Sequence, residues 1–354
     1  MNNLTRVFFF LLLSNILSLQ AQIGGDNTYE FLNLSTSARA TALGGTLIAV
    51  SDDDAALAYS NPAALNPAMS NQLTFNHHFH LGNVQNGYFG FAHHQKNWKT
   101  TFHGGIQYIN YGDFSSTDEI GNVFGTFEAK EMAIALGAGR QLSDHYHIGA
   151  NLRYINSRLE GYQSNGLAVD LAAMYRDTAK RLNIALVFKN AGRQLTTYTP
   201  GIREPLPFEI QLGLSHKLKY LPLRLSATAN HLERWSIRYD DPNAVTSTFL
   251  TDEEQTGPSP FVLQLDNFFR HMIFSGEFLL GKRENLRFRI GYNHFRKSEM
   301  SIANFRSLAG FSGGFGIKIN RFRLEYGYAA YHIAGGAHHL SIATDIDEFL
   351  GKVY

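Results

Sequence analysis

The sequence contains no cysteine, and beyond its first residues it has no long hydrophobic run. With 354 residues and no cysteine, disulfide bonds cannot stabilise the chain if it is exported, so its stability must have another source. After residue 21 no stretch approaches the run of about 18 apolar residues that indicates a membrane-spanning helix. These two absences exclude a disulfide-stapled secreted domain and a helical membrane protein.

Charge of one sign and proline are also scarce. The formal net charge is +1 and no block of like charges occurs, so nothing points to a nucleic acid or to an acidic partner. There are only 9 prolines, whereas aromatic residues make up 13% of the chain and glycine occurs 32 times. This composition favours closely packed strands over a helical bundle or disorder. We therefore predict an all-β protein.

The first residues have the features of an export signal. Arg6 precedes an apolar run that starts at Val7, and the small residue Ala21 provides a cleavage site. We predict a signal peptide over residues 1–21 and a mature chain that starts at Gln22. An uncleaved anchor is the weaker alternative, because the apolar run is shorter than the roughly 20 residues that a spanning helix needs.

From Asn71 onward, apolar and polar residues alternate with the period of two that is typical of strands with different faces. Phe288, Ile290 and Tyr292, for example, alternate with two arginines and a glycine. Such segments predict strands at 71–81, 84–95, 99–112, 126–140, 145–158, 162–176, 181–191, 206–217, 222–233, 268–280, 285–297, 305–318, 321–331 and 337–345. An even number is expected of a bacterial single-chain barrel. The predicted fold is a transmembrane antiparallel β-barrel of about 14 strands over residues 71–345, followed by a tail at 346–354.

Loop lengths support a barrel over a soluble β-sandwich. Connections after even-numbered predicted strands are short, whereas most of those after odd-numbered strands are longer, as at 113–125, 192–205 and 234–267. The tight first hairpin at Gly82 is an exception. Outer-membrane barrels have short periplasmic turns and longer outside loops, and a sandwich has no reason to separate loop lengths in this way. The loop 234–267 could bind a partner or be disordered.

The segment at 22–70 differs from the barrel strands, since it is rich in alanine and turn residues and alternates little. We expect a short helix from Ser51 or Asp52 to Tyr59, ended by Asn61 and Pro62. The segment resembles the hatch that folds into the lumen of FadL-like outer-membrane barrels. The matching positions are Ser37, Arg39, Gly44, Gly45, Asp52, Asp53, Asn61, Pro62 and Ala63.

A wider resemblance covers almost the whole mature chain. The phrases that carry it lie at 24–34, 106–114, 190–199, 204–215 and 239–243, and include YDDPN and EPLPFEIQLGLS. In order and spacing the sequence resembles the PorQ family of the type IX secretion system. The resemblance implies a non-enzymatic part of a surface attachment complex in the outer membrane of a Gram-negative bacterium. That complex processes exported cargo and attaches it, with a PorU-like sortase, a PorV-like barrel and a PorZ-like protein as partners.

On this hypothesis the outside loops would bind the partners. The candidate residues are Arg193, Tyr198, Arg203, Tyr239, Asp240, Asp241 and Pro242. The FadL-like hatch allows an alternative, a transporter of small hydrophobic molecules. That alternative requires an apolar lumenal pocket, and the inward residues that can be read from the strands are mainly Arg, Glu, Gln, Asn and Gly.

The sequence predicts neither catalytic residues nor a cofactor, because it contains no Gly-x-Ser-x-Gly, His-Glu-x-x-His or Walker motif.

Barrel closure would bring His338 and His339 near His78 and His80, so a metal site at the rim is an alternative. No carboxylate or cysteine completes that ligand set, and we predict no metal. Outer-membrane lipid is the expected environment of the barrel, and no nucleic acid is expected to bind.

Three further sets of side chains stand out in the sequence. The run from Asp52 to Asp54 could bind a divalent ion, but a helix cap or a salt bridge to Arg39 or a barrel arginine is more usual. The arginines predicted to line the lumen are Arg153, Arg287, Arg289 and Arg323. We expect the tyrosines near strand ends to form girdles at the membrane interfaces; these are Tyr88, Tyr108, Tyr154, Tyr292 and Tyr326.

Overall fold

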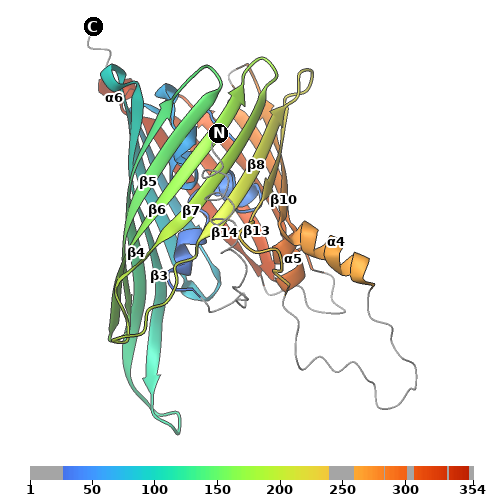
Figure 1. Ribbon diagram of the computed structural model, residues 1–354. Helices are drawn as coiled ribbons and strands as arrows, with labels where there is room; N and C mark the ends of the chain where they lie inside the picture. The colour runs from blue at the N-terminus through green and yellow to red at the C-terminus, as the bar shows by residue number, and fades with distance from the viewer. Residues whose placement is uncertain (1–26, 239–258, 283, 301–306, 333–334, 351–354) are drawn as a thin grey trace, which may run out of the picture.

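The strands form one closed wall. The fold is described from a computed structural model, in which residues 27–238, 259–282, 284–300, 307–332 and 335–350 are placed. Within those residues fourteen strands form an antiparallel barrel, each paired with its neighbours in sequence. The wall closes because β14 returns to β1, with His339 opposite His78 (Figure 1). The predicted fold class is confirmed.

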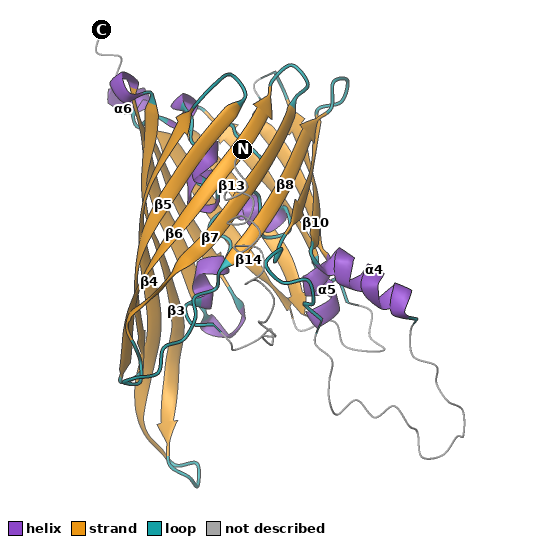
Figure 2. Ribbon diagram, in the orientation of Figure 1, coloured by secondary structure: helices purple, strands orange, loops and turns teal. Residues whose placement is uncertain are grey.

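The strands differ considerably in length. Their bounds are β1 Gln72–Phe79, β2 Gln85–Gln95, β3 Thr100–Thr117, β4 Val123–Gln141, β5 Tyr146–Leu159, β6 Tyr162–Asp177, β7 Leu182–Thr196, β8 Glu209–Lys217, β9 Leu223–Ala229, β10 Met272–Leu280, β11 Leu286–Asn293, β12 Phe311–Ile319, β13 Phe322–His332 and β14 Gly335–Asp345. The longest described strands, β3 and β4, extend well beyond the rest of the wall as a hairpin (Figure 2).

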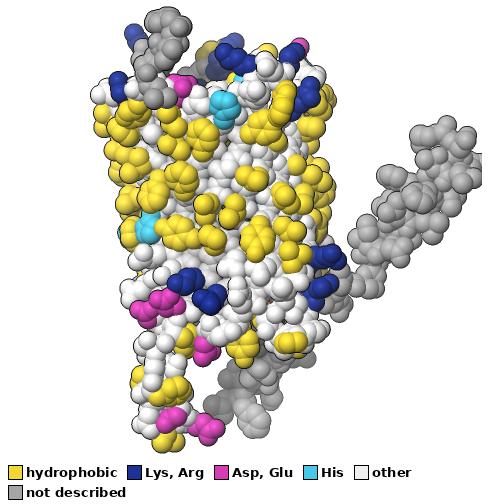
Figure 3. Space-filling model, turned by 90° about the vertical axis from the view of Figure 1, so that its left-hand side faces the viewer, with side chains coloured by type: hydrophobic (Ala, Val, Ile, Leu, Met, Phe, Trp, Pro, Cys, Tyr) yellow, Lys and Arg dark blue, Asp and Glu magenta, His cyan; other side chains and the backbone are white. Residues whose placement is uncertain are grey.

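Alternation along each strand separates an apolar outer face from a polar inner face. In β8, Glu209 and Gln211 are buried, whereas Leu212 and Leu214 are each 45% exposed on the outside. On the face shown in Figure 3, apolar side chains cover the wall between its two ends, and charged side chains gather toward those ends. This is the lipid-facing belt expected of a membrane barrel. Separately, no helix in the described residues is both long and apolar enough to cross a bilayer.

The two ends of the barrel carry different connections. The turns after β2, β4, β6, β8, β10 and β12 are short and lie at the end where α6 Asp347–Leu350 sits (Figure 1). One predicted loop is wrong, because most of 113–125 continues β3 and β4, which pair as far as Thr117 and Val123. Phe114 and Phe127 stack across this extension with ring centroids 5.3 Å apart. Cross-strand aromatic pairs of this kind stabilise a ladder beyond the membrane.

The predicted strands at 268–280 and 285–297 are too long, because helices occupy their outer ends. Helix α4, Pro260–Arg270, precedes β10, and helix α5, His294–Met300, follows β11. The start of α4 is readable in sequence, since the Ser259 hydroxyl accepts a hydrogen bond from the amide of Val262 and proline occupies the first turn. Over a few residues, an apolar pattern does not separate the end of a short helix from the start of a strand.

The N-terminal segment, defined here as residues 27–70, lies inside the barrel (Figure 2). Its elements are η1 Glu30–Asn33, α2 Ala38–Ala42, α3 Leu57–Ser60, η2 Pro62–Ala64 and η3 Pro67–Met69. Helix α2 packs on β11 to β14, and η2 packs on β4 to β6. The barrel contributes glycines at these contacts: a Cβ on Gly149 would lie 2.3 Å from the carbonyl carbon of Pro62. Small residues on both sides therefore allow the segment to fill the lumen.

Two details of the sequence interpretation need correction. The predicted helix begins at Leu57 rather than at Ser51 or Asp52, because the Ser51 hydroxyl donates to the backbone oxygen of Ala64 and the Asp52 carboxylate binds Arg39. Asn61 and Pro62 end it as expected. Tyr88 belongs to no interfacial girdle, since its side chain is fully buried in the lumen beside Tyr59.

Candidate functional site

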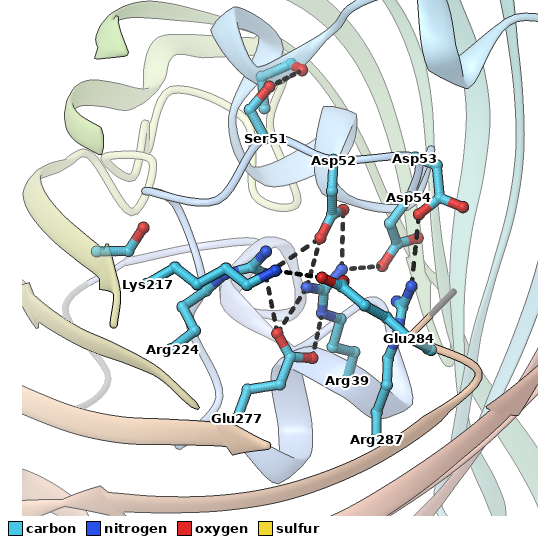
Figure 4. A network of polar contacts seen from close by, with 12 residues as sticks. Arg39, Ser51, Asp52, Asp53, Asp54, Lys217, Arg224, Glu277, Glu284 and Arg287 are labelled. Atoms are coloured by element: carbon cyan, nitrogen blue, oxygen red, sulfur yellow. Dashed lines mark hydrogen bonds and ion pairs between the residues drawn. The ribbon is translucent and has the colours of Figure 1, made fainter. Parts of the chain in front are cut away.

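Arg39 is the centre of an ion-pair network in the lumen. Its side chain has no exposed surface and contacts three carboxylates: Asp52 at 2.7 Å, Asp54 at 3.1 Å and Glu277 of β10 at 2.9 Å. Figure 4 shows these carboxylates converging on the guanidinium from the N-terminal segment and from the wall. A buried charge is tolerated only with such compensation. Arg39 therefore ties the segment both to itself and to the barrel.

Four barrel arginines extend this network. Arg224 contacts Asp52 and Glu277, and Arg289 bridges Glu277 and Glu325 at 2.8 and 2.7 Å. The other two reach the acidic run: Arg323 lies 3.1 Å from Asp53, and Arg287 lies 3.6 Å from it. The three aspartates thus face guanidinium groups, and each takes part in at least one salt bridge. The acidic run therefore forms the salt bridges expected as the alternative to a divalent-ion site.

Arg153 makes a second anchor on the opposite part of the wall. It donates to the backbone oxygen of Tyr59 at 2.7 Å, pairs with Asp170 at 2.5 Å and stacks 4.1 Å from the centre of the Tyr59 ring. Its remaining partner is the side-chain oxygen of Asn190. All four arginines predicted to line the lumen do so, and each contacts the N-terminal segment or a side chain bound to it.

The other residues of the FadL-like pattern shape the backbone of the segment. The Ser37 hydroxyl caps α2 by accepting from the amide of Ala40 at 3.1 Å. Gly44 and Gly45 have φ angles of 97° and 103°, which residues other than glycine rarely adopt. The Asn61 side-chain oxygen accepts from the amide of Ala63 at 2.8 Å, and Pro62 opens η2. These residues set the backbone conformation of the segment, and none of them lines an apolar pocket.

An apolar pocket of about 370 Å³ opens at the outer end of the lumen. The N-terminal segment contributes Phe31 and Leu34, and the wall contributes Val84, Ile109 and Tyr111. The sequence did not reveal this pocket, because Phe31, Leu34 and Val84 lie outside the strands and meet the wall only in the folded chain. Ile109, by contrast, keeps the inward position that alternation gives it in β3.

A polar chamber of about 390 Å³ adjoins the pocket, and Leu34 and Tyr331 line both. Lys189, Glu209 and Gln211, all buried, line the chamber together with His231 from the loop after β9. Burial lowers the pKa of an imidazole, but the carboxylates of Glu233 and Glu209 outweigh that effect and raise the pKa of His231. The outer lumen therefore has an apolar and a charged side.

Barrel closure brings three of the candidate rim histidines together. The His78 ring lies 4.0 Å from that of His80 and 4.5 Å from that of His339, centre to centre. His338 faces outward and contacts the Tyr326 hydroxyl at 2.8 Å. The His78 and His339 rings are stacked, with planes 13° apart, so their nitrogens do not converge on one point. In the described residues no group of three or more histidine or carboxylate side chains is placed to hold a metal.

The structure separates the candidate partner-binding residues. Arg193, in β7, and Arg203 are exposed. Tyr198 turns inward and donates to the Ser157 hydroxyl at 2.5 Å, so it supports the lumen rather than an outer surface. The other candidates, from Tyr239 to Pro242, lie outside the described residues.

Comparisons with known proteins give similarity in structure only. No protein-family model matches the sequence, and no curated protein matches it. Among solved structures, the chain is similar to the toluene transporter TodX of Pseudomonas putida, with a TM-score of 0.49 and 11% identity over 88% of this chain and 96% of that one. A FadL homologue of Pseudomonas aeruginosa gives 0.49 and 10% over 88% and 98%. The CymD monoaromatic hydrocarbon channel gives 0.44 and 16% over 88% and 96%.

The geometry of the chain itself defines the class. A closed antiparallel wall with an apolar outer belt, a polar inner face and turns that are short at one end is a transmembrane β-barrel. Barrels of this construction are outer-membrane proteins of Gram-negative bacteria. Membrane lipid is therefore the medium that its outer face contacts.

Proposed function

We propose that this barrel takes up a small apolar molecule from outside the cell and binds it first in the apolar pocket at the outer end of the lumen. The observation that carries the proposal is the lining of that pocket, in which Phe31, Leu34, Val84 and Ile109 form apolar walls beside Glu30 and His80. An apolar solute gains about 25 cal/mol for each Å² that it removes from water there.

The position of the pocket also suggests how binding would be coupled to passage. Phe31 and Leu34 belong to the N-terminal segment, which fills the lumen below and is held by Arg39 and Arg153. A molecule in the pocket touches the element that must move to admit it. Binding of the molecule can favour a shifted position of the segment only if the shifted state binds the molecule more tightly.

The proposal is tested by ligand binding to the barrel in lipid nanodiscs, with toluene as the probe because it is the ligand named for one of the similar structures. Val84→Phe should fill the pocket and weaken toluene binding about tenfold or more. Leu221→Phe, at an exposed turn of the opposite end, is the matched control and should bind as the wild type does. Equal binding by all three proteins, or none by the wild type, would refute the proposal.

A second function, docking of attachment-complex proteins as the PorQ resemblance implies, is favoured by one feature. The tip of the β3–β4 hairpin projects outside the membrane belt and carries Ile120, Val123 and Phe124 at 84%, 64% and 74% exposure (Figure 2). Apolar groups gathered in water commonly mark a protein contact. On this proposal a PorZ-like surface protein covers the tip and is thereby retained at the outer membrane.

Replacing these three residues by serine tests the docking proposal. The variant should no longer co-purify the surface protein from detergent-extracted outer membranes, while its barrel stays folded in heat-modifiability gels. A matched variant with serine at Leu142 and Leu221, which are exposed at the other end, should retain the partner. Retention by both variants would contradict docking at the hairpin tip.

A further inference from the structure

We infer that helix α4 lies in the outer leaflet of the membrane, with one face in the lipid and the other fixed to the barrel. This role is independent of the uptake and docking proposals. The partner is a lipid surface, and the residues that meet it are Phe261, Val262, Leu265, Phe268 and Phe269.

The spacing of these five residues places them on one side of the helix. They fall at intervals of one, four, seven and eight residues from the first, which is the pattern of a single apolar stripe at 3.6 residues per turn. All five are exposed, from 72% at Phe261 to 38% at Phe269. A stripe of large apolar groups on a helix in water is unfavourable, so an apolar medium must cover it.

The opposite side of α4 is held by polar contacts, which fix the direction of the stripe. Buried Asn267 donates to the backbone oxygen of Trp235 and accepts from the amide of Ile237. Arg270 pairs with Asp266 in its own helix and with Glu299 in α5. The helix therefore cannot turn its apolar side toward the barrel without breaking these bonds.

Continuity with the lipid belt identifies the occupant as membrane rather than a protein. The Phe269 ring lies 6.5 Å from that of Phe274, which belongs to the outward face of β10. Trp235, 62% exposed, sits beside the same junction and stacks on His271. In Figure 1 the helix projects sideways from the wall near the outer end of β10, rather than outward along the barrel axis. An amphipathic helix in this position lies along the interface, with its apolar face in the acyl region.

The cysteine-free sequence permits a direct test with single cysteines. Leu265→Cys on the stripe is compared with Leu212→Cys in the belt, since both leucines are 45% exposed, and with Ile120→Cys at the hairpin tip. Each variant is labelled with the same fluorophore and placed in lipid nanodiscs. Fluorescence loss is then measured with nitroxide-labelled lipid and, separately, with iodide in the water.

The inference predicts that the label at Leu265 loses fluorescence to nitroxide lipid, as the label at Leu212 does, and is protected from iodide. Strong loss to iodide, as expected at Ile120, would overturn it. Protection from both quenchers would also overturn it, because protein would then cover the stripe. Heat-modifiability of each labelled variant confirms that the barrel is folded, so the outcomes do not depend on toluene uptake or on partner binding.

Discussion

Arg39 and Glu277 are separated by 238 residues in the chain and are joined in the lumen by two hydrogen bonds of 3.0 and 2.9 Å. Neither side chain is more than 2% exposed. Because Glu277 also contacts Arg224 and Arg289, one carboxylate connects three guanidinium groups. The pair is thus the main polar link between the N-terminal segment and β10.

Glu277→Gln should destabilise the protein strongly, because it leaves the buried Arg39 and Arg289 and the partly buried Arg224 with less compensation. Loss of one partner from a buried ion pair typically costs about 3–5 kcal/mol. The measurement is the urea midpoint of unfolding of the barrel in lipid vesicles. The control is Glu284→Gln, whose partly exposed pair with Lys217 should contribute less than about 1 kcal/mol. Equal midpoints for the two variants would show that the network is not a main source of stability.

Glu277→Gln should also let ions pass through the lumen more often. In Glu277→Gln the N-terminal segment loses its ion pair with β10, so its open states become more populated and ions pass more readily. Single-channel recording in planar bilayers should show a higher open probability for Glu277→Gln than for Glu284→Gln. If the two variants have equal open probabilities, Arg153 and the packing of η2 are enough to hold the segment in place.

Gly149→Ala should disturb the contact between β5 and the N-terminal segment, since the added Cβ would meet the carbonyl carbon of Pro62 at 2.3 Å. Overpacking of this kind costs about 1–3 kcal/mol. Gly161→Ala is the matched control, because a Cβ there has no neighbour within 4 Å. Thermal unfolding should separate the two variants. If they unfold together, the segment can move away from the wall with little cost.

The loop after β9 should show a pH-dependent contribution from His231 and Glu233. The raised pKa of His231 makes its contribution fully present below the ordinary value of 6.5 and lost as the pH rises through the raised value. The lowered pKa of Glu233 makes its contribution present above 4.5 and lost as the pH falls through the lowered value. The pair therefore stabilises most between those limits.

His231→Gln should remove this dependence. Hydrogen exchange of the amide of Ile210, which donates to Glu233 at 2.9 Å, reports on the loop directly. Protection in the wild type should exceed that in the variant at about pH 6 and approach it by about pH 9. A constant difference across this range would show that the imidazole charge does not matter.

Export and cleavage at Ala21 can be tested by mass spectrometry of the protein extracted from outer membranes. The mature chain should begin at Gln22, with residues 1–21 absent. Ala21→Leu should slow cleavage, because the processing site requires a small residue there. An intact first residue in the mature protein would favour the uncleaved anchor.

The sequence specified the wall of this barrel. Alternation such as Phe288 with Arg289 requires two environments on the two sides of a strand, and the spacing of turns gives the number of strands. One short-range signal inside the N-terminal segment was also readable: Asn61 with Pro62 ends a helix. These features depend on neighbouring residues, which is why one sequence suffices to predict them.

Only the tertiary structure decided which distant residues meet. It paired Arg39 with Glu277, turned Tyr88 and Tyr198 inward and joined Phe31 to Ile109 in an apolar pocket. It also showed a helix where alternation had suggested the start of β10. The alternating pattern fixes which side of the wall a residue faces, but not what the folded segment places against it. That contact depends on the path of the chain through the lumen, which local spacing does not encode.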